Sequence, residues 1–306
     1  MTTRILLIHE GGDQETLEDL RRAARRAGIE TKHVRLRELV LHIGSKVEVR
    51  TIDGERVDLY DGGVVRGIGA LMNIVQFLRR LALLRALEEL GVVLMNPVEP
   101  MMAARNKLEA LVRLRLAGLP TPETFSYESA RLTYELCRRW RKVVLKPVAG
   151  SRGFGAILAE GPDVAFNVLR ELAAYRIPML VQRYIEGPGW DLRVFVVGGE
   201  VIAAMKRVAR GDWRCNIAQG GVGEPAKIDD EIAELAVKAT EALGLWYAGV
   251  DIVLGEEGPY ILELNASPDW RELKRVTGVD PSDAIIRYLI EVIRGGREAC
   301  GGRGSA

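Results

Sequence analysis

Two acidic residues, Asp251 and Glu263, lie on neighbouring apolar stretches of the sequence that resemble the two strands of a β-hairpin. If residues 250–254 and 260–265 pair, both acids are equally far from the middle of the turn and lie directly opposite each other. Such side chains are about 4.5–5.5 Å apart, and like charges there are destabilising unless a cation lies between them. Asn265, two residues beyond Glu263, points to the same face. Because Mg²⁺ prefers oxygen ligands, the pattern predicts a divalent-metal site.

The opposite face of this hairpin is predicted to be apolar, which fixes its register, since a slip of one residue would bury the acids. This face would carry Val250, Ile252, Leu254, Leu262 and Leu264. The alternative interpretation is a solvent-exposed hairpin with two incidental acids. If a metal binds, neutralising either acid is expected to relieve charge repulsion, spare the fold and lower turnover by orders of magnitude.

A glycine-rich loop over residues 150–155 separates two predicted strands, residues 142–147 and 155–159. A loop between strands predicts a hairpin flap, whereas a dinucleotide-binding or P-loop fingerprint opens a helix. Glycines let the backbone approach a phosphate closely and present several N–H groups to it. Lys146, at the edge of the flap, would add a point charge for the same anion. An ordinary glycine-rich turn is the competing interpretation.

A second hairpin is predicted from residues 191–197 and 200–207, which flank a Gly-Gly pair typical of two-residue turns. This register places Asp191 opposite Lys206, with Arg193 on the same face. A simple ion pair would explain Asp191 and Lys206 equally well. Four hydrogen-bond donors follow in the sequence: Arg207, Arg210, Arg214 and Asn216. They indicate a local anion-binding site, and surface arginines on a loop are the alternative interpretation.

The amino-acid composition excludes several classes of function. The 306 residues carry 43 basic and 42 acidic side chains, which leaves no overall field to recruit nucleic acid or membrane. No apolar run approaches the roughly 18–20 residues that span a bilayer, and the N-terminus enters a strand, so a cytoplasmic protein is expected. Cys137, Cys215 and Cys300 show no metal-ligand spacing, which indicates incidental reduced thiols.

Strands and helices alternate in the first hundred residues, which predicts an α/β lobe. The predicted strands cover residues 4–9, 62–65 and 92–95, and the predicted helices cover residues 15–27 and 73–90. Their glycine clusters match neither GxGxxG nor GxxxxGK, so a Rossmann or Walker-A site is not indicated.

The later segments predict an α+β organisation. Predicted helices cover residues 102–116, 127–140, 163–175, 229–243 and 281–294, with a strand over residues 179–185. Lys107 lies in the first of these helices, where a solvent-exposed charge is the competing interpretation. We expect an N-terminal domain over residues 1–96, a central lobe with the flap over 97–181, a C-terminal lobe with the metal site over 182–296, and a flexible tail over 297–306.

Several motifs in this order resemble the ATP-grasp superfamily and, within it, the RimK-type α-L-glutamate ligases. They are Ala104-Arg105-Asn106-Lys107-Leu108, Val144-Leu145-Lys146-Pro147 with the flap, Val181-Gln182-Arg183-Tyr184-Ile185, Asp191-Leu192-Arg193, Ala203-Ala204-Met205-Lys206-Arg207, Gly249-Val250-Asp251-Ile252 and Glu263-Leu264-Asn265-Ala266-Ser267-Pro268. The resemblance runs from about Arg66 to Arg294.

The resemblance implies an ATP-grasp fold, with an N-terminal α/β lobe and two α+β lobes that clasp ATP. It assigns the nucleotide to Lys107, Lys146, Gly150, Ser151, Gly153, Gly155, Gln182, Arg183, Tyr184, Ile185 and Asp191. It assigns Mg²⁺, with Mn²⁺ as a substitute, to Asp251, Glu263 and Asn265. It places Arg193, Lys206, Arg207, Arg214 and Asn216 near the transferred phosphate or the acyl substrate.

The reaction implied by the resemblance is ligation in two steps. A substrate carboxylate attacks the γ-phosphoryl group of ATP to give an acyl phosphate and ADP, and an amine then displaces phosphate to form an amide. The expected partners are glutamate and a carboxylate acceptor on a coenzyme, carrier protein or peptide end, without nucleic acid or membrane; a homo-oligomer is left open. The alternatives are an ATP-grasp ligase for another amino acid or peptide, and a non-catalytic nucleotide-binding regulatory protein.

The chain departs from the usual family pattern at four places. Arg183 replaces a glutamate, Gln219 replaces an arginine, Asp269 replaces a glycine, and Gly67 is an additional glycine. None of these falls on the metal or flap positions, so the departures concern acceptor recognition more than ATP chemistry.

Overall fold

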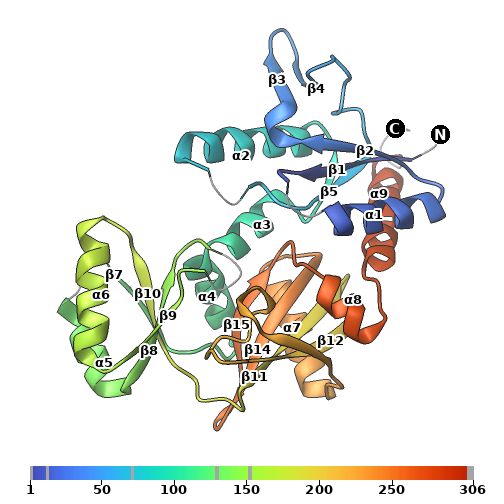
Figure 1. Cartoon of the computed structure of the whole chain (residues 1–306). Coiled ribbons are helices and arrows are strands. Elements are labelled where there is room, and N and C mark those ends of the chain that lie inside the picture. Colours follow the sequence, from blue (N-terminus) through green and yellow to red (C-terminus); the bar gives the residue numbers. More distant parts are fainter. Residues whose placement is uncertain (1–2, 12–13, 70–71, 128–130, 151–153, 302–306) are drawn as a thin grey trace.

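The computed structural model describes the chain apart from residues 1–2, 12–13, 70–71, 128–130, 151–153 and 302–306. Its described residues form three large β-sheets accompanied by helices, together with a small two-stranded sheet (Figure 1). The mixed α/β and α+β architecture expected from the sequence is therefore confirmed. Within the described ranges, no helix has both the length and the apolar character needed to cross a membrane.

The first sheet is parallel and has the strand order β2-β1-β5-β6. Its elements are β1 (Arg4–His9), α1 (Gln14–Arg26), β2 (Glu30–Arg35), β5 (Gly62–Val65), α2 (Ile74–Glu89) and β6 (Val93–Met95). A short 3₁₀ turn (Leu36–Glu38) leads into the projecting hairpin of β3 (Leu39–Ile43) and β4 (Val47–Thr51). The sequence analysis predicts β1, β5 and β6 but not β2, β3 and β4, because β2 is mostly polar and β3 and β4 are only five residues long.

The second sheet is antiparallel and has the order β7-β10-β8-β9. Its elements are β7 (Thr124–Tyr127), α5 (Arg131–Trp140), β8 (Lys142–Pro147), β9 (Ile157–Glu160), α6 (Pro162–Ala174) and β10 (Met179–Arg183). The predicted helix over residues 127–140 is wrong at its start, because residues 124–127 form an edge strand instead. The glycine-rich segment does connect two paired strands, as predicted for a flap.

The third sheet is antiparallel and has the order β13-β12-β11-β14-β15. Its strands are β11 (Trp190–Val197), β12 (Glu200–Val208), β13 (Val222–Pro225), β14 (Tyr247–Gly255) and β15 (Gly258–Asn265), with a 3₁₀ turn at Ile217–Gln219. The accompanying helices are α7 (Asp230–Ala242) and α8 (Arg271–Thr277), and α9 (Ser282–Gly301) ends the described chain.

The single helix predicted over residues 102–116 is two helices, α3 (Val98–Arg105) and α4 (Lys107–Leu116). Asn106 separates the two helices, because its backbone is extended (φ −87°, ψ 98°) and its side chain accepts a hydrogen bond from the Glu109 N–H at 3.3 Å. Asparagine is a favoured N-cap residue, which explains the new start. Lys107 therefore begins a helix instead of lying inside one.

The register predicted for the acidic hairpin is confirmed at the acids, since Asp251 pairs directly with Glu263. Near the turn the pairing is shifted by one residue from the prediction, because Gly255 lies opposite Gly258 instead of Pro259, and a bulge between Asp251 and Ile252 restores the predicted register at the acids. Leu262, which was predicted on the apolar face, instead lines the cavity described below.

The predicted pairing of Asp191 with Lys206 is wrong. A bulge between Phe195 and Val196 shifts the β11–β12 register by one residue, which places Asp191 opposite Arg207. Because side chains alternate along a strand, this shift replaces Lys206 by Arg207 as the partner of Asp191.

The first and third sheets share two hydrophobic cores, whereas the second sheet has a core of its own. Asn96, fully buried after β6, joins the two sheets by hydrogen bonds. Its amide nitrogen donates to the carbonyls of Tyr247 (2.8 Å) and Ala266 (2.7 Å), and its oxygen accepts from the N–H groups of Trp246 (2.7 Å) and Tyr247 (3.0 Å). These four hydrogen bonds hold the first lobe against the strand that carries Glu263.

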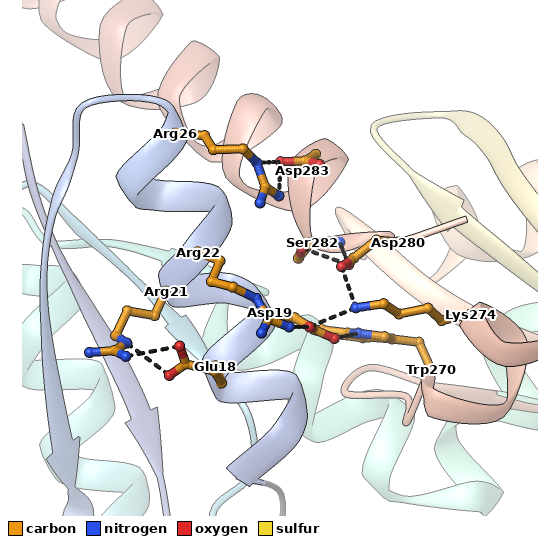
Figure 2. Close-up of polar contacts among 10 residues, drawn as sticks. All are labelled: Glu18, Asp19, Arg21, Arg22, Arg26, Trp270, Lys274, Asp280, Ser282 and Asp283. Carbon is orange, nitrogen blue, oxygen red and sulfur yellow. Dashed lines mark hydrogen bonds and ion pairs between the residues drawn. The ribbon is translucent and has the colours of Figure 1, made fainter. Parts of the chain in front are cut away.

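A polar network also fastens α1 to the last helices (Figure 2). The buried carboxylate of Asp19 accepts hydrogen bonds from Trp270 Nε1 (3.1 Å) and Lys274 Nζ (2.7 Å), and it pairs with Arg22. Lys274 bridges onward to Asp280 at 2.6 Å. The helix α9 itself packs against α1 and β6 beside the first sheet.

Candidate active site

A cavity gathers most of the predicted site residues. Its walls come from β8 and β10 of the second sheet and from β11, β12, β14 and β15 of the third sheet. The predicted residues that line it are Lys107, Lys146, Gly150, Gln182, Arg183, Tyr184, Ile185, Asp191, Arg207, Arg214, Asn216, Asp251 and Glu263.

Four predicted residues lie outside this lining: Gly155, Arg193, Lys206 and Asn265. Arg193 still contacts the site through Asp251. The ammonium of Lys206 lies 4.3 Å from the centre of the Trp190 ring, as a consequence of the β-bulge that places Arg207 opposite Asp191. Ser151 and Gly153 fall outside the described residues.

Sequence reasoning missed the apolar and aromatic part of the lining, which includes Trp190, Trp213, Phe154 and Val253. The signal for these tryptophans is their position in the sequence, because Trp190 directly precedes Asp191 on β11 and Trp213 directly precedes Arg214 in the loop after β12. Cys215 also lines the cavity as a free thiol, and burial raises its pKa to about 11, which favours the unreactive protonated form.

Asp251 lies at the centre of a row of charged residues across three neighbouring strands. Arg193 pairs with it from β11, and Glu263 lies opposite it on β15. Arg193 Nη2 donates to Asp251 Oδ2 at 2.9 Å, and Arg207 Nη2 lies 2.9 Å from the same oxygen. The Asp251 side chain is only 4% exposed, so two guanidinium groups hold a buried carboxylate.

Arg207 joins Asp251 to the second buried carboxylate, Asp191. Its Nε and Nη2 donate to the two Asp191 oxygens at 2.7 and 2.6 Å, which is a bidentate pair. Burial acts to lower the pKa of Arg207, but the carboxylates of Asp251 and Asp191 outweigh it and raise that pKa. Arg207 therefore remains charged inside the cavity.

Glu263 faces the cavity from β15, and Lys107 reaches it from the first turn of α4. The Lys107 Nζ atom lies 2.8 Å from Glu263 Oε2 and 2.9 Å from the Gly150 carbonyl at the start of the flap. Although burial opposes ionisation, the Lys107 ammonium holds the pKa of Glu263 at about 2. The break at Asn106 thus directs a cation at the predicted metal site and at the flap.

The donor set at this end of the cavity fits Mg²⁺. Asp251 and Glu263 supply carboxylate oxygens, and Asn265, two residues beyond Glu263 on β15, would add its amide oxygen. The Asn265 Nδ2 group is buried without a partner in the described part of the chain, but as a donor it cannot bind a cation. Within the described ranges, no three His, Cys, Asp or Glu side chains are arranged to hold a metal ion by themselves. The carboxylates of Asp191, Asp251 and Glu263 face a larger number of cations: Arg193, Arg207, Lys107 and Lys146. This excess of positive charge suits a polyphosphate.

Lys146 lies on β8 at the other side of the cavity, where its Nζ donates to Gln182 Oε1 at 2.7 Å. The Gln182 amide nitrogen in turn donates to Thr124 Oγ1 at 2.9 Å, which fixes the orientation of the Gln182 side chain. Burial lowers the pKa of Lys146 to about 8, only partly offset by the Glu263 carboxylate. A bound phosphate would favour the ammonium form again.

Nucleotide binding should therefore take up a proton on Lys146 between pH 8 and 9, because at a pKa of about 8 the Lys146 amine of the free protein is about half deprotonated at pH 8 and mostly deprotonated at pH 9. Calorimetric titration with ADP and Mg²⁺ in two buffers of different ionisation enthalpy measures this uptake. At pH 6.5 the uptake should vanish, and the K146M variant should bind more weakly without pH-dependent uptake. Equal proton uptake by the wild type and K146M would contradict this role.

Two α+β sheets enclose a cavity that is lined by lysines and ends in a pair of carboxylates, and with the sequence relatives this arrangement identifies an ATP-dependent ligase with the ATP-grasp fold. The sequence model of the RimK-like ATP-grasp domain matches residues 104–289. The chain belongs to this family, as the sequence motifs indicated.

Two relatives illustrate the similarity. The chain is 33% identical over 290 residues to the ribosomal protein bS6–L-glutamate ligase of Salmonella schwarzengrund, covering 94% of this chain and 95% of that protein. It is 39% identical over 212 residues to a "Probable alpha-L-glutamate ligase" of Parasynechococcus marenigrum, covering 68% of this chain and 46% of that protein.

Solved structures share the fold at lower identity. The ATP-grasp ligase PsnB, complexed with a phosphomimetic variant of its minimal precursor, Mg and ADP, superposes with a TM-score of 0.76 at 23% identity, covering 95% of this chain and 99% of that one. The macrocyclase MdnC of Microcystis aeruginosa, bound with its precursor peptide, superposes with a TM-score of 0.73 at 16% identity, covering 94% and 100%.

Proposed function

We propose that this protein uses ATP and Mg²⁺ to join L-glutamate, through an α-amide linkage, to a carboxylate of a peptide or protein. The observation that carries the proposal is the row of Asp251 and Glu263 at the end of the cavity, faced by Lys107, Arg193 and Arg207. Phosphoryl transfer depends on positioning and charge neutralisation more than on covalent chemistry by the protein, and this row supplies both.

Each part of the cavity has a role in this proposal. Lys107, Lys146 and the flap backbone at Gly150 bind the phosphates, and residues 182–185 bind the adenine. Asp191 lies at the ribose, where its orientation is fixed by Arg207. When bound at Asp251, Glu263 and Asn265, Mg²⁺, or Mn²⁺ in its place, neutralises the charge of the phosphate oxygens.

The reaction proceeds in two steps without a nucleophile from the protein. An acceptor carboxylate oxygen bonds to the γ-phosphorus as the bond to ADP breaks, which gives an acyl phosphate. The amine then bonds to the acyl carbon, the bond to phosphate breaks, and the amine loses a proton. Arg207, Arg214 and Asn216, which all line the cavity, donate hydrogen bonds to the oxygens that become charged.

The glutamate and the acceptor rest on the relatives. The relative from Salmonella is named for glutamate and a ribosomal protein, and the match spans nearly its whole length. A peptide or protein carboxylate is therefore the acceptor class we favour over a coenzyme or a carrier protein.

The purified protein should release ADP and phosphate only when ATP, Mg²⁺, glutamate and an acceptor peptide are all present. A coupled ADP assay, with mass spectrometry of the peptide, should show a mass increase of one glutamate residue for each ADP formed. Omission of either glutamate or the peptide is the matched control. Release of AMP in place of ADP, or tight nucleotide binding without turnover on a broad substrate panel, would reject the proposal.

A further inference from the structure

The first lobe contributes no described residue to the cavity lining, yet it lies against the end of the cavity that carries Glu263. Arg66 Nη2 donates to the Pro268 carbonyl at 2.8 Å, and Ser267 Oγ donates to the Val65 carbonyl at 3.4 Å. Because both contacts follow directly on Asn265 in the chain, the carboxyl end of β5 lies beside the metal end.

This edge of the first sheet is where a ligand is expected on topological grounds. In the order β2-β1-β5-β6, β2 lies on one side of β1, and the later strands β5 and β6 lie on its other side. The strand order therefore reverses between β1 and β5. Open parallel sheets bind ligands outside the carboxyl ends of their strands at such a point. Glu10 follows β1 and residues 66–69 follow β5, so both border this position.

Two of the three arginines at this edge are committed to partners within the protein. Arg80 forms a buried ion pair with Glu10, with Nη2 and Oε2 3.3 Å apart, and donates to the Ile68 carbonyl at 2.5 Å. Arg66 lies over the Trp270 ring, 4.3 Å from its centre, in addition to its bond to Pro268. Arg80 and Arg66 therefore have structural roles at this edge of the first sheet.

Arg105, at the end of α3, differs from them. Its Nη2 donates to the Gly69 carbonyl at 3.2 Å, and no carboxylate of the described residues forms an ion pair with it. Burial lowers its pKa without any acidic group to offset the effect. A half-buried guanidinium with a carbonyl as its partner retains several donors for an anion.

Given the proposed ligase function, we propose that Arg105 binds the α-carboxylate of the amino acid whose amine attacks the acyl phosphate. Arg105 lies two residues before Lys107, whose Nζ contacts Glu263, and it reaches towards the first lobe at Gly69. In the proposed function the adenine lies at residues 182–185 and the phosphates at Lys107, Lys146 and Gly150, which leaves the side of the first lobe for the amine. The planar guanidinium matches a carboxylate in geometry as well as charge.

The test compares glutamate with isoglutamine, in which the α-carboxylate is an amide. The R105Q variant keeps a donor for the Gly69 carbonyl but loses the charge. Wild-type kcat/KM should favour glutamate by about 10- to 100-fold, the range of a charge-assisted hydrogen bond. In R105Q the KM for glutamate should rise by a similar factor, the KM for ATP should stay unchanged, and the preference for glutamate should vanish.

Two further variants separate binding from structure. R113Q, which removes an exposed partner of Glu109 on α4, should behave as the wild type. R105K keeps the charge and should retain part of the preference for glutamate. If R105Q lowers activity on glutamate and isoglutamine equally, Arg105 is structural and the inference is overturned.

The wild-type assay separates this inference from the proposed function. If the wild type ligates another amino acid, the glutamate assignment fails, and that amino acid and its α-carboxamide then test Arg105 in the same way. If the wild type ligates glutamate and R105Q keeps the full preference over isoglutamine, only the inference fails. An amine substrate without a carboxylate, or no ligation at all, overturns both.

Discussion

The E263Q variant should lose about 100- to 1,000-fold in kcat, the usual effect of removing one group that stabilises transition-state charge. Glutamine keeps the shape of the side chain but removes the charge at the metal end of the cavity. The Glu263 carboxylate is ionised over the working pH range, because the Lys107 ammonium, against the effect of burial, holds its pKa at about 2. Steady-state ADP release with saturating glutamate and acceptor measures the loss.

The same variant should keep most of its stability. Glu263 is 21% exposed, its ion pair is with Lys107, and Lys107 also bonds to the Gly150 carbonyl. The free energy of unfolding should fall by about 1 kcal/mol, as for a partly exposed ion pair. E256Q is the matched control, because Glu256 is an exposed acid at the turn of the same hairpin. Normal turnover in E263Q, or an equal loss in E256Q, would exclude Glu263 from the proposed metal site.

The opposition of Asp251 and Glu263 could be predicted from the sequence because apolar residues flank both acids on each strand. The pairing of Asp191 could not, because the bulge that shifts it lies between Phe195 and Val196, two apolar residues that look alike in the pattern. A bulge also occurs in the acidic hairpin, where it corrects an error of one residue in the predicted turn. The pairing of the two acids was therefore predicted correctly in part because the shift at the turn and the shift at the bulge cancel.

The cations around the acids could not be predicted from local spacing. Arg193 faces Asp251 because β11 and β14 are neighbours, although their sequence positions are far apart. Lys107 reaches Glu263 because Asn106 ends one helix and caps the next, without a glycine or proline to mark the break. Such contacts depend on the order of strands in the third sheet, which hydrophobic periodicity does not specify.

These cations change the prediction for the D251N variant. From the sequence alone, removal of one of two facing acids relieves repulsion and leaves the fold intact. In the structure, Asp251 is 4% exposed and holds both Arg193 and Arg207. Its neutralisation leaves the buried Arg193 without its carboxylate, whereas Arg207 keeps Asp191. Breaking a buried ion pair typically costs about 3–5 kcal/mol, and we expect that loss in the free energy of unfolding.

Turnover in D251N should fall at least as far as in E263Q even at a temperature where the variant is folded, because Asp251 orients Arg207 and, in the proposed function, also binds the metal. Urea unfolding followed by circular dichroism measures the stability, and ADP release at low temperature measures the activity. The double variant D251N/R193M should recover part of the stability, since it removes one unpaired charge, but none of the turnover. Wild-type stability in D251N would show that Arg193 and Arg207 do not depend on this carboxylate, and the central ion pair of the site would have to be reassigned.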